Sequence, residues 1–109
     1  MSLNRYDTKR DANEPLIVET LRRNGISVYA IDKPLDLLCG YGNETRLAEV
    51  KDTRNKRGDP KPYTPTQKAF LDTWKGGHTL LVTVEDAMAL AVDMKRKADT
   101  RSQFKRVKI

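Results

Sequence analysis

The sequence predicts an α/β domain in which helices flank a mixed central β-sheet. Its helical and strand-like segments follow one another in the order α-β-β-β-α-β-α. The pair Gly42-Asn43 separates two strand-like segments by two residues, which is a typical signal of a tight hairpin. The last strand-like segment, TLLVTV at 79–84, lies between two helical segments, and this arrangement favours helices packed on a mixed sheet.

The first helix is predicted over residues 11–25, DANEPLIVETLRRNG, where Asn24-Gly25 provides a typical C-terminal stop. One face of this helix follows the i, i+3, i+4, i+7 spacing of an amphipathic helix. That face is formed by Glu14, Ile17, Val18 and Leu21. Glu14 is therefore expected on the side that packs against the sheet. The strand ISVYAI at 26–31 is expected to follow.

The next two strands, PLDLLCGY at 34–41 and ETRLAEVKD at 44–52, are expected to pair across Gly42-Asn43. A two-residue loop fixes the partners, so that position 41 faces 44, 39 faces 46 and 37 faces 48. By the same register Asp36 faces Glu49. Their Cβ atoms would then lie about 4.5–5.5 Å apart, a distance at which like charges destabilise a sheet.

The segment TPTQKAFLDTWKGG at 64–77 predicts a second helix, with Thr64 as its N-cap and Gly76-Gly77 at its end. Its inward, core-facing side is expected to carry Gln67, Phe70, Leu71 and Trp74. The most apolar segment, 79–84, predicts a central strand. A last helix is predicted over 85–97, and its inward residues are expected to be Ala87, Leu90, Ala91 and Met94.

The chain of 109 residues suits one compact domain, which we expect over residues 1–94, followed by a basic tail at 95–109. No run of about 18 apolar residues indicates a membrane span, and the polar N-terminus lacks the apolar centre of a secretory signal. The single cysteine, Cys39, allows no internal disulfide and is expected to be a buried strand residue. These features indicate a cytoplasmic protein.

The positive charge of the chain is concentrated in the tail. Residues 95–109 hold seven Lys/Arg and one Asp, whereas residues 1–94 hold fourteen basic and fourteen acidic side chains. The tail is open to two interpretations, a solvated chain end or an arm that contacts phosphates and releases counterions. A second basic cluster at 51–62 favours a polyanionic partner. Five side chains are predicted to contact nucleic acid: Arg54, Lys56, Arg57, Lys61 and Lys68.

Metal coordination provides a reason for two carboxylates on neighbouring strands, because a divalent cation turns their repulsion into attraction. Carboxylate oxygens suit Mg²⁺, for which Mn²⁺ is expected to substitute. Such a cation polarises a phosphate and lowers the pKa of an attacking water. Lys51 projects from the same strand face as Glu49 and is placed to stabilise the developing charge. Glu14 is a further candidate ligand, and the pattern fits metal-assisted hydrolysis of a phosphodiester.

Asp36 followed by Glu49-Val50-Lys51 resembles the motif of the PD-(D/E)xK nuclease superfamily, whose members have a restriction-endonuclease-like core. A longer pattern spread over residues 7–92 resembles the small stand-alone VRR-NUC domains of bacteria and phages. It consists of DANEPLIV, LRRNGISV, LDLLCGYGNETRLAEVKD and YTPTQKAFLDTWKG. The pattern Asp…Glu-x-Lys alone is weak evidence, and the upstream helix and the downstream TPxQ helix make the resemblance more specific.

The resemblance implies a divalent-metal-dependent, structure-selective endonuclease that acts on branched DNA such as Holliday junctions. The implied metal ligands are Asp36, Glu49, the main-chain carbonyl of Val50 and, as a candidate, Glu14. Lys51 would assist the nucleophile, and Gln67 would line the site. The implied partners are DNA and a second copy of the chain, in a bacterial or phage-infected cell, with no organic cofactor. In two departures from the family, Leu35 separates Pro34 from the aspartate, and the family's arginines are not evident in TLLVTVED.

Simpler interpretations stay open for these residues. Asp36, Glu49 and Lys51 can form a solvent-facing set of strand charges, which would contribute little energy. Gln67 can simply close a capping box at the start of its helix, and Glu14 can be a first-turn carboxylate favoured by the helix dipole. For the whole chain, the alternative function is a non-catalytic DNA-binding or assembly module that keeps the nuclease fold.

Overall fold

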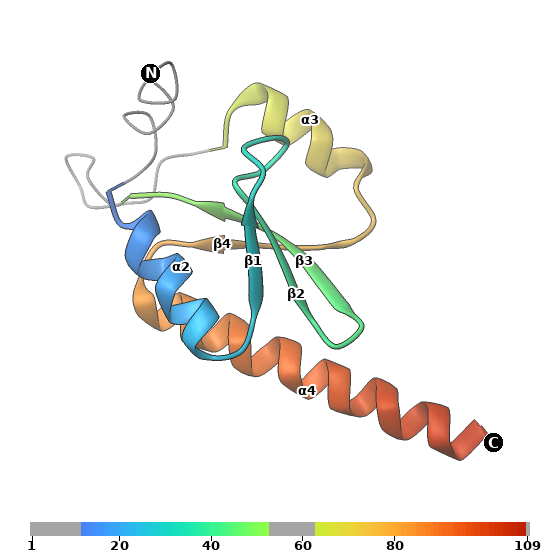
Figure 1. Ribbon diagram of the computed structural model, residues 1–109. Helices are drawn as coiled ribbons and strands as arrows, with labels where there is room; N and C mark the ends of the chain where they lie inside the picture. The colour runs from blue at the N-terminus through green and yellow to red at the C-terminus, as the bar shows by residue number, and fades with distance from the viewer. Residues whose placement is uncertain (1–11, 53–62, 109) are drawn as a thin grey trace.

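The computed structural model describes residues 12–52 and 63–108, with side chains up to Asp99. Within this part of the chain, the elements follow the predicted order α-β-β-β-α-β-α (Figure 1). They are α2 (Glu14–Arg23), β1 (Ser27–Ala30), β2 (Leu37–Tyr41), β3 (Glu44–Val50), α3 (Pro65–Thr73), β4 (Gly77–Leu81) and α4 (Val84–Lys108). The predicted α/β class with a mixed sheet is confirmed.

The described strands form one sheet in the order β1-β2-β3-β4, with β1, β2 and β3 antiparallel and β4 parallel to β3. The β2–β3 hairpin has the predicted register, because Tyr41 faces Glu44 and Leu37 faces Ala48. Gly42 has a φ of 59°, in the left-handed region that tight hairpin turns use and that glycine adopts without strain. The local turn therefore sets the register of the whole hairpin.

Strand β4 lies at the edge of the described sheet, so the prediction of a central strand at 79–84 is wrong. Pairing with β3 ends at Leu81 because the remaining apolar residues lead into α4. A reciprocal cap forms there: the amide of Asp86 donates to Thr83 Oγ1 at 3.0 Å, and the amide of Thr83 donates to Asp86 Oδ2 at 3.1 Å. This cap satisfies the first amides of the helix and terminates the strand.

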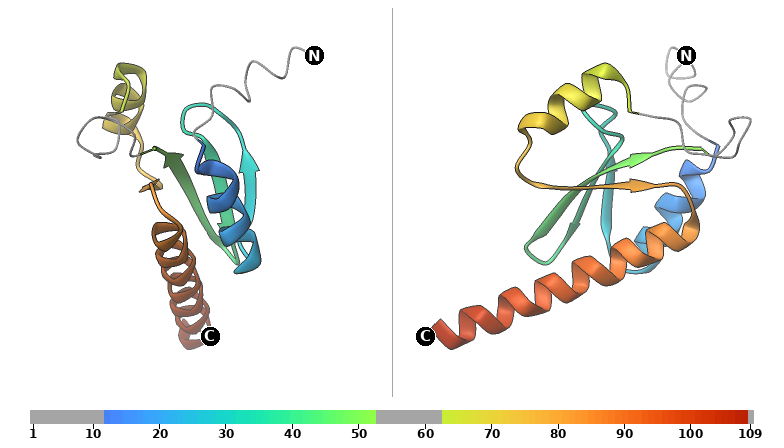
Figure 2. Two further views of the ribbon diagram at one scale, coloured as in Figure 1. Left: turned by 90° about the vertical axis from the view of Figure 1, so that its left-hand side faces the viewer. Right: turned by 180° about the vertical axis from the view of Figure 1, so that it is seen from behind.

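The core lies between the sheet and the helices α2 and α4, which pack against each other (Figure 1 and Figure 2). Helix α2 contributes Ile17 and Leu21, which have no exposed surface. The predicted inward residues of the last helix, Ala87, Leu90, Ala91 and Met94, are all buried. Cys39 is buried as expected, and its burial raises the pKa of the thiol to about 11. The predicted inward faces of the first and last helices are confirmed.

Helix α3 packs differently from the prediction, because none of its residues is fully buried. Phe70 and Trp74 stack on each other with ring centroids 5.3 Å apart. Trp74 is 40% exposed, so the expectation that these aromatic residues belong to the core is wrong. The indole lies over the connection to β4, where its Nε1–H donates to the carbonyl of Gly77 at 3.3 Å. The helix ends at Thr73 rather than at the glycine pair.

Helix α4 continues to Lys108, although the sequence pattern predicts its end at residue 97. Residues 84–108 contain neither glycine nor proline, so nothing in the backbone interrupts the helix. Its C-terminal half extends past the rest of the molecule (Figure 1). The predicted boundary between the domain and the basic tail at residues 94 and 95 thus falls within one helix. In the described part of the chain, no helix combines the length and apolar character needed to cross a membrane.

Candidate active site

Asp36 and Glu49 lie side by side where β2 begins and β3 ends. Each carboxylate accepts a hydrogen bond from the other segment's backbone. The amide of Val50 donates to Asp36 Oδ2 at 2.9 Å, and the amide of Asp36 donates to Glu49 Oε1 at 3.1 Å. These bonds satisfy amides beyond the last strand pair, Leu37–Ala48. The carboxylates therefore close the open end of the hairpin, and the sheet register fixes their positions.

The ammonium group of Lys51 pairs with one of these acids. Its Nζ lies 3.2 Å from Glu49 Oε2, and only 4% of Glu49 and 8% of Lys51 is exposed. The interpretation of these residues as solvent-facing strand charges is therefore wrong. Burial of such charges is costly unless they are paired and hydrogen-bonded. The ring of Tyr63 adds a cation–π contact, with its centroid 5.9 Å from Nζ.

Gln67 connects α3 to this ion pair. Its backbone amide donates to Thr64 Oγ1 at 3.1 Å, and its side-chain Oε1 accepts from the amide of Thr64 at 3.0 Å, which completes a capping box. Because the cap engages Oε1, the other end of the side-chain amide is free to donate from Nε2 to Glu49 Oε2 at 2.7 Å. Lys51 Nζ also lies 3.5 Å from Oε1. Gln67 both caps the helix and contacts the predicted site.

Thr64→Ala is expected to destabilise α3 selectively. The substitution removes the hydroxyl of the cap and should lower the free energy of unfolding by about 1 kcal/mol, because α3 has no fully buried residue to hold it in place. Chemical denaturation measures the loss, and hydrogen exchange locates it in α3. Thr66→Ala, at an exposed position of the same helix, is the control and should change stability by less than about 0.5 kcal/mol. Equal losses in the two variants would contradict the importance of the cap.

The ionised form of Asp36 is disfavoured in this site. Burial raises the pKa of Asp36 to about 7; the hydrogen bond from Val50 opposes the increase, and the charges of Glu49 and Glu14 add to it. Glu14 lies in the first turn of α2 and is 6% exposed, so it occupies the inward face as predicted. The charges of Glu14 and Glu49 are thus close enough to act on Asp36, and Lys51 is paired with Glu49.

The residues present suit a hard divalent cation. Mg²⁺ is typically bound by one or two protein carboxylates and keeps water or substrate oxygens as its other ligands. Asp36 and Glu49 supply two carboxylates, and a cation between them would relieve the repulsion that contributes to the raised pKa of Asp36. Where side chains are described, no three His, Cys, Asp or Glu residues form a preassembled metal cluster. The roles of Glu14 and of the Val50 carbonyl as ligands stay predictions.

Comparisons of the chain with protein-family models, with curated proteins and with solved structures found no match. The resemblance to VRR-NUC domains therefore stays a prediction made from the residues themselves. A functional assignment depends on the geometry of the buried acids and the lysine, and on the chemistry that such a group can perform.

Two residues of the site have no clear signal in the sequence. Asn13 precedes α2 and donates from Nδ2 to the main-chain carbonyls of Lys51 at 3.0 Å and of Val82 at 2.6 Å. It thereby joins the ends of β3 and β4 to the start of α2. Tyr63 precedes α3 and places its ring beside Lys51. Both residues act from outside helices and strands and across long sequence separations, where hydrophobic periodicity gives no information. The position of Asn13 next to Glu14 is the only hint.

Four of the five residues predicted to contact nucleic acid lie outside the described residues: Arg54, Lys56, Arg57 and Lys61. Lys68 is exposed on α3 and directly follows Gln67. His78 is exposed on β4 and lines a different pocket.

Proposed function

We propose that this chain is a divalent-metal-dependent endonuclease of the PD-(D/E)xK type, similar to VRR-NUC domains, which hydrolyses phosphodiester bonds in DNA. The observation that carries the proposal is the group at the open end of the hairpin, where the half-buried Asp36 lies beside the buried ion pair of Glu49 and Lys51. Three antiparallel strands followed by a helix and a parallel strand are also compatible with a restriction-endonuclease-like core.

Each member of the group has a distinct role in this proposal. Asp36, Glu49 and the main-chain carbonyl of Val50 would hold the cation, with Glu14 as a further candidate ligand. When bound, Mg²⁺ or Mn²⁺ would supply Lewis acidity toward the phosphate. Lys51 stabilises the negative charge that develops on the phosphate during attack. Because Glu49 already accepts from Asp36 and from α3, its carboxylate enters the reaction with its orientation fixed.

A polyanionic substrate fits the charge of the chain. The net charge of +6 is carried by residues 95–109, and through residue 108 this segment continues α4. We propose branched DNA such as a Holliday junction as the preferred substrate and a homodimer as the working form. Symmetric cleavage of two strands favours two related sites, which a two-fold dimer supplies.

A second candidate function is a non-catalytic DNA-binding or assembly module with the same fold. The structure offers one observation in its favour. Asp36 and Glu49 each satisfy a backbone amide at the end of the hairpin, so both carboxylates have a structural role that is independent of metal. This candidate predicts salt-sensitive DNA binding that is unaffected by divalent cations and survives the loss of Lys51.

Cleavage assays distinguish these candidates. The purified chain is incubated with a four-way junction, a flap and a linear duplex, in Mg²⁺, in Mn²⁺ or in EDTA. We expect cleavage of branched DNA with either metal and none in EDTA. Binding without cleavage under every condition would support the second candidate. The absence of both binding and cleavage at low salt would overturn both candidates.

The raised pKa of Asp36 predicts that stability depends on pH and metal together. The pKa rises from its ordinary value of 3.8 to about 7 in the folded protein, so the folded state binds this proton more tightly than the unfolded chain. The contribution of Asp36 to stability therefore falls as the pH rises from about 4 to about 7 and is lowest above that range. A bound cation would replace the proton and offset this loss.

Mg²⁺ should accordingly raise Tm more at pH 8 than at pH 5. A gain of about 1 kcal/mol corresponds to about 4–8 °C for a domain of this size. Thermal unfolding in Mg²⁺ and in EDTA at the two pH values measures the difference. In Asp36→Asn the side-chain oxygen can still accept the hydrogen bond from the Val50 amide. The Tm of this variant should depend much less on pH and on Mg²⁺. The prediction would be contradicted if Mg²⁺ raised the Tm of the wild type by the same amount at the two pH values, as it is expected to do in the variant.

A further inference from the structure

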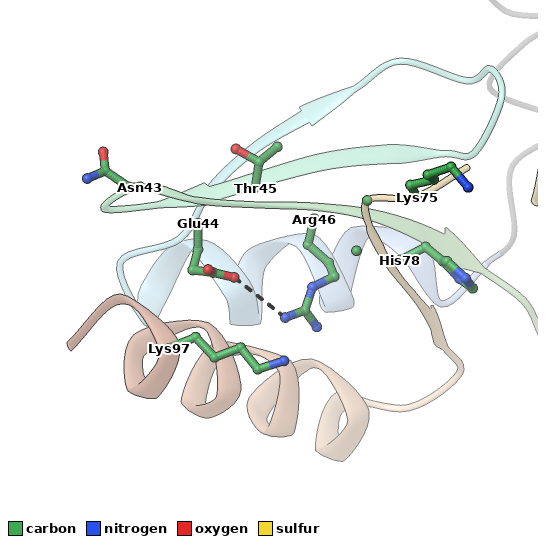
Figure 3. A pocket seen from close by; sticks show the side chains of 9 residues that line it. Asn43, Glu44, Thr45, Arg46, Lys75, His78 and Lys97 are labelled. Carbon is green, nitrogen blue, oxygen red and sulfur yellow. Dashed lines mark ion pairs between the residues drawn. The ribbon is translucent and has the colours of Figure 1, made fainter. Parts of the chain in front are cut away.

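A second polar pocket lies away from the acids, toward the β2–β3 turn. It has a volume of about 560 Å³ and is open to solvent. Figure 3 shows Arg46 pointing from β3 toward α4, where Lys97 lies, while Lys75 and His78 come from the start of β4 and the segment before it. Arg46 is paired with Gly77, whereas Glu49 is paired with Leu80. Arg46 and Glu49 are thus three residues, or about 10 Å, apart along β3, and their side chains project from opposite faces of the sheet because side chains alternate along a strand.

Basic groups outnumber acidic groups at the α4 side of this pocket. Asp93 lies 3.0 Å from Arg46, 3.6 Å from Lys97 and 3.9 Å from Arg96, so one carboxylate is shared by three cations. Glu44 gives Arg46 a longer contact of 3.8 Å. Lys97 keeps 58% of its side-chain surface exposed. The carboxylates near the pocket therefore leave positive charge that faces the solvent.

The β4 side adds further donors that are available to a ligand. Lys75 is exposed and forms no ion pair within the described residues, and His78 is exposed at the same end of β4. Gly77 lies between the two sides, and a Cβ there would lie 2.7 Å from Arg46 Nε, so a larger residue would displace the Arg46 side chain. The bare backbone lets the guanidinium lie against the edge strand. Cations from β3, from α4 and from the segment before β4 thus line a single opening at the edge of the described sheet.

We propose that this pocket binds phosphate groups of the DNA backbone, with Lys75 and Lys97 as its principal contacts and Arg46 as the residue that sets its floor. The inference rests on the proposed nuclease function and adds a place where the DNA strand is held outside the cleavage site. Phosphate contacts by lysine and arginine position a protein on nucleic acid without reading sequence. Lys97 also belongs to the basic segment 95–109, which through residue 108 continues α4 (Figure 1).

Two natural reporters are available, because His78 lines this pocket and Trp74 adjoins its lining residue Gly77. His78 is the only histidine of the chain and Trp74 is the only tryptophan, and the indole of Trp74 hydrogen-bonds to the carbonyl of Gly77. A linear duplex is titrated into the full chain in EDTA, which prevents metal-dependent cleavage. We expect a shift of the His78 imidazole resonances and a change in tryptophan fluorescence, both saturating together with DNA binding.

Lys75→Ala combined with Lys97→Ala should weaken duplex binding about tenfold at moderate salt. It should also reduce the slope of log Kobs against log salt concentration by about 1–2, because each lost phosphate contact removes released counterions. Arg23→Gln, on the exposed face of α2, is the charge control and should leave the slope unchanged. Circular dichroism verifies that each variant is folded.

Any of three outcomes would overturn the proposal that this pocket binds the DNA backbone. The duplex saturates while His78 and Trp74 do not respond; the double variant has the wild-type slope; or inorganic phosphate shifts His78 and the duplex does not, which would make the pocket a site for small anions. The nuclease proposal is judged separately by Mg²⁺-dependent cleavage with the wild-type chain. If the chain cleaves DNA but His78 and Trp74 do not respond to the duplex, only the pocket proposal fails. If His78 and Trp74 respond but no DNA is cleaved, only the nuclease proposal fails.

Discussion

Lys51→Met is expected to lower the rate of Mg²⁺-dependent DNA cleavage by about 10²–10³-fold, the effect typical of losing one group that stabilises transition-state charge. The substitution keeps most of the aliphatic stem and removes the ammonium that lies 3.2 Å from Glu49 Oε2. If the group acts on the developing phosphate charge, the loss falls on kcat rather than on DNA affinity. Cleavage under single-turnover conditions and DNA binding in EDTA separate the two effects.

Glu49→Gln is the matched variant for the acid. Its side-chain oxygen can still accept from the amide of Asp36, whereas Glu49→Ala would leave that amide and Gln67 without their acceptor. An unsatisfied buried group costs about 1–3 kcal/mol of stability. A loss of cleavage in the alanine variant could therefore come from unfolding as well as from the missing carboxylate. Lys33→Ala, at an exposed position, is the control and should retain activity. Wild-type cleavage rates in both Lys51→Met and Glu49→Gln would refute the assignment of the site.

Leu37→Ala is expected to destabilise the fold by about 2–5 kcal/mol, the usual cost of truncating a fully buried leucine. Leu37 has no exposed surface, belongs to the core cluster and faces Ala48 across the hairpin. The corresponding fall in Tm is more than about 8 °C for a domain of this size. Because Leu37 directly follows Asp36, the cavity would form immediately behind the proposed metal site.

Leu16→Ala provides the comparison for this loss. Leu16 lies on α2 with 56% of its surface exposed, so its truncation should change stability by less than about 0.5 kcal/mol. Urea denaturation of both variants, with m-values compared, measures the two effects on the same scale. A similar small loss in both variants would contradict the position of Leu37 in the core.

Local information in the sequence was sufficient for the hairpin. The two residues Gly42-Asn43 define the turn, and the turn fixes every pair that follows, including Leu37 with Ala48. The closeness of Asp36 and Glu49 follows from the same counting, without knowledge of the rest of the fold. The inward faces of α2 and α4 were also predictable, because helical periodicity repeats within each segment.

Predictions failed where the environment of a segment depends on distant parts of the chain. The apolar run at 79–84 suggests a central strand, yet β4 lies at the edge of the described sheet, and the end of the run forms the helix cap of Thr83 and Asp86. Trp74 has the spacing of a core residue but covers the connection to β4. Periodicity identifies an apolar face without identifying what packs against it.

The sequence by itself determined that Asp36, Glu49 and Lys51 come together, because a tight turn and a two-residue strand period are local properties of the backbone. Only the tertiary structure decided the state of those residues. Gln67 from α3 hydrogen-bonds to Glu49, and Glu14 from α2 contributes to the raised pKa of Asp36. Both contacts join segments that are far apart in the chain. Burial and electrostatic coupling arise when such segments exclude water from the same place, and this depends on the packing of the whole domain.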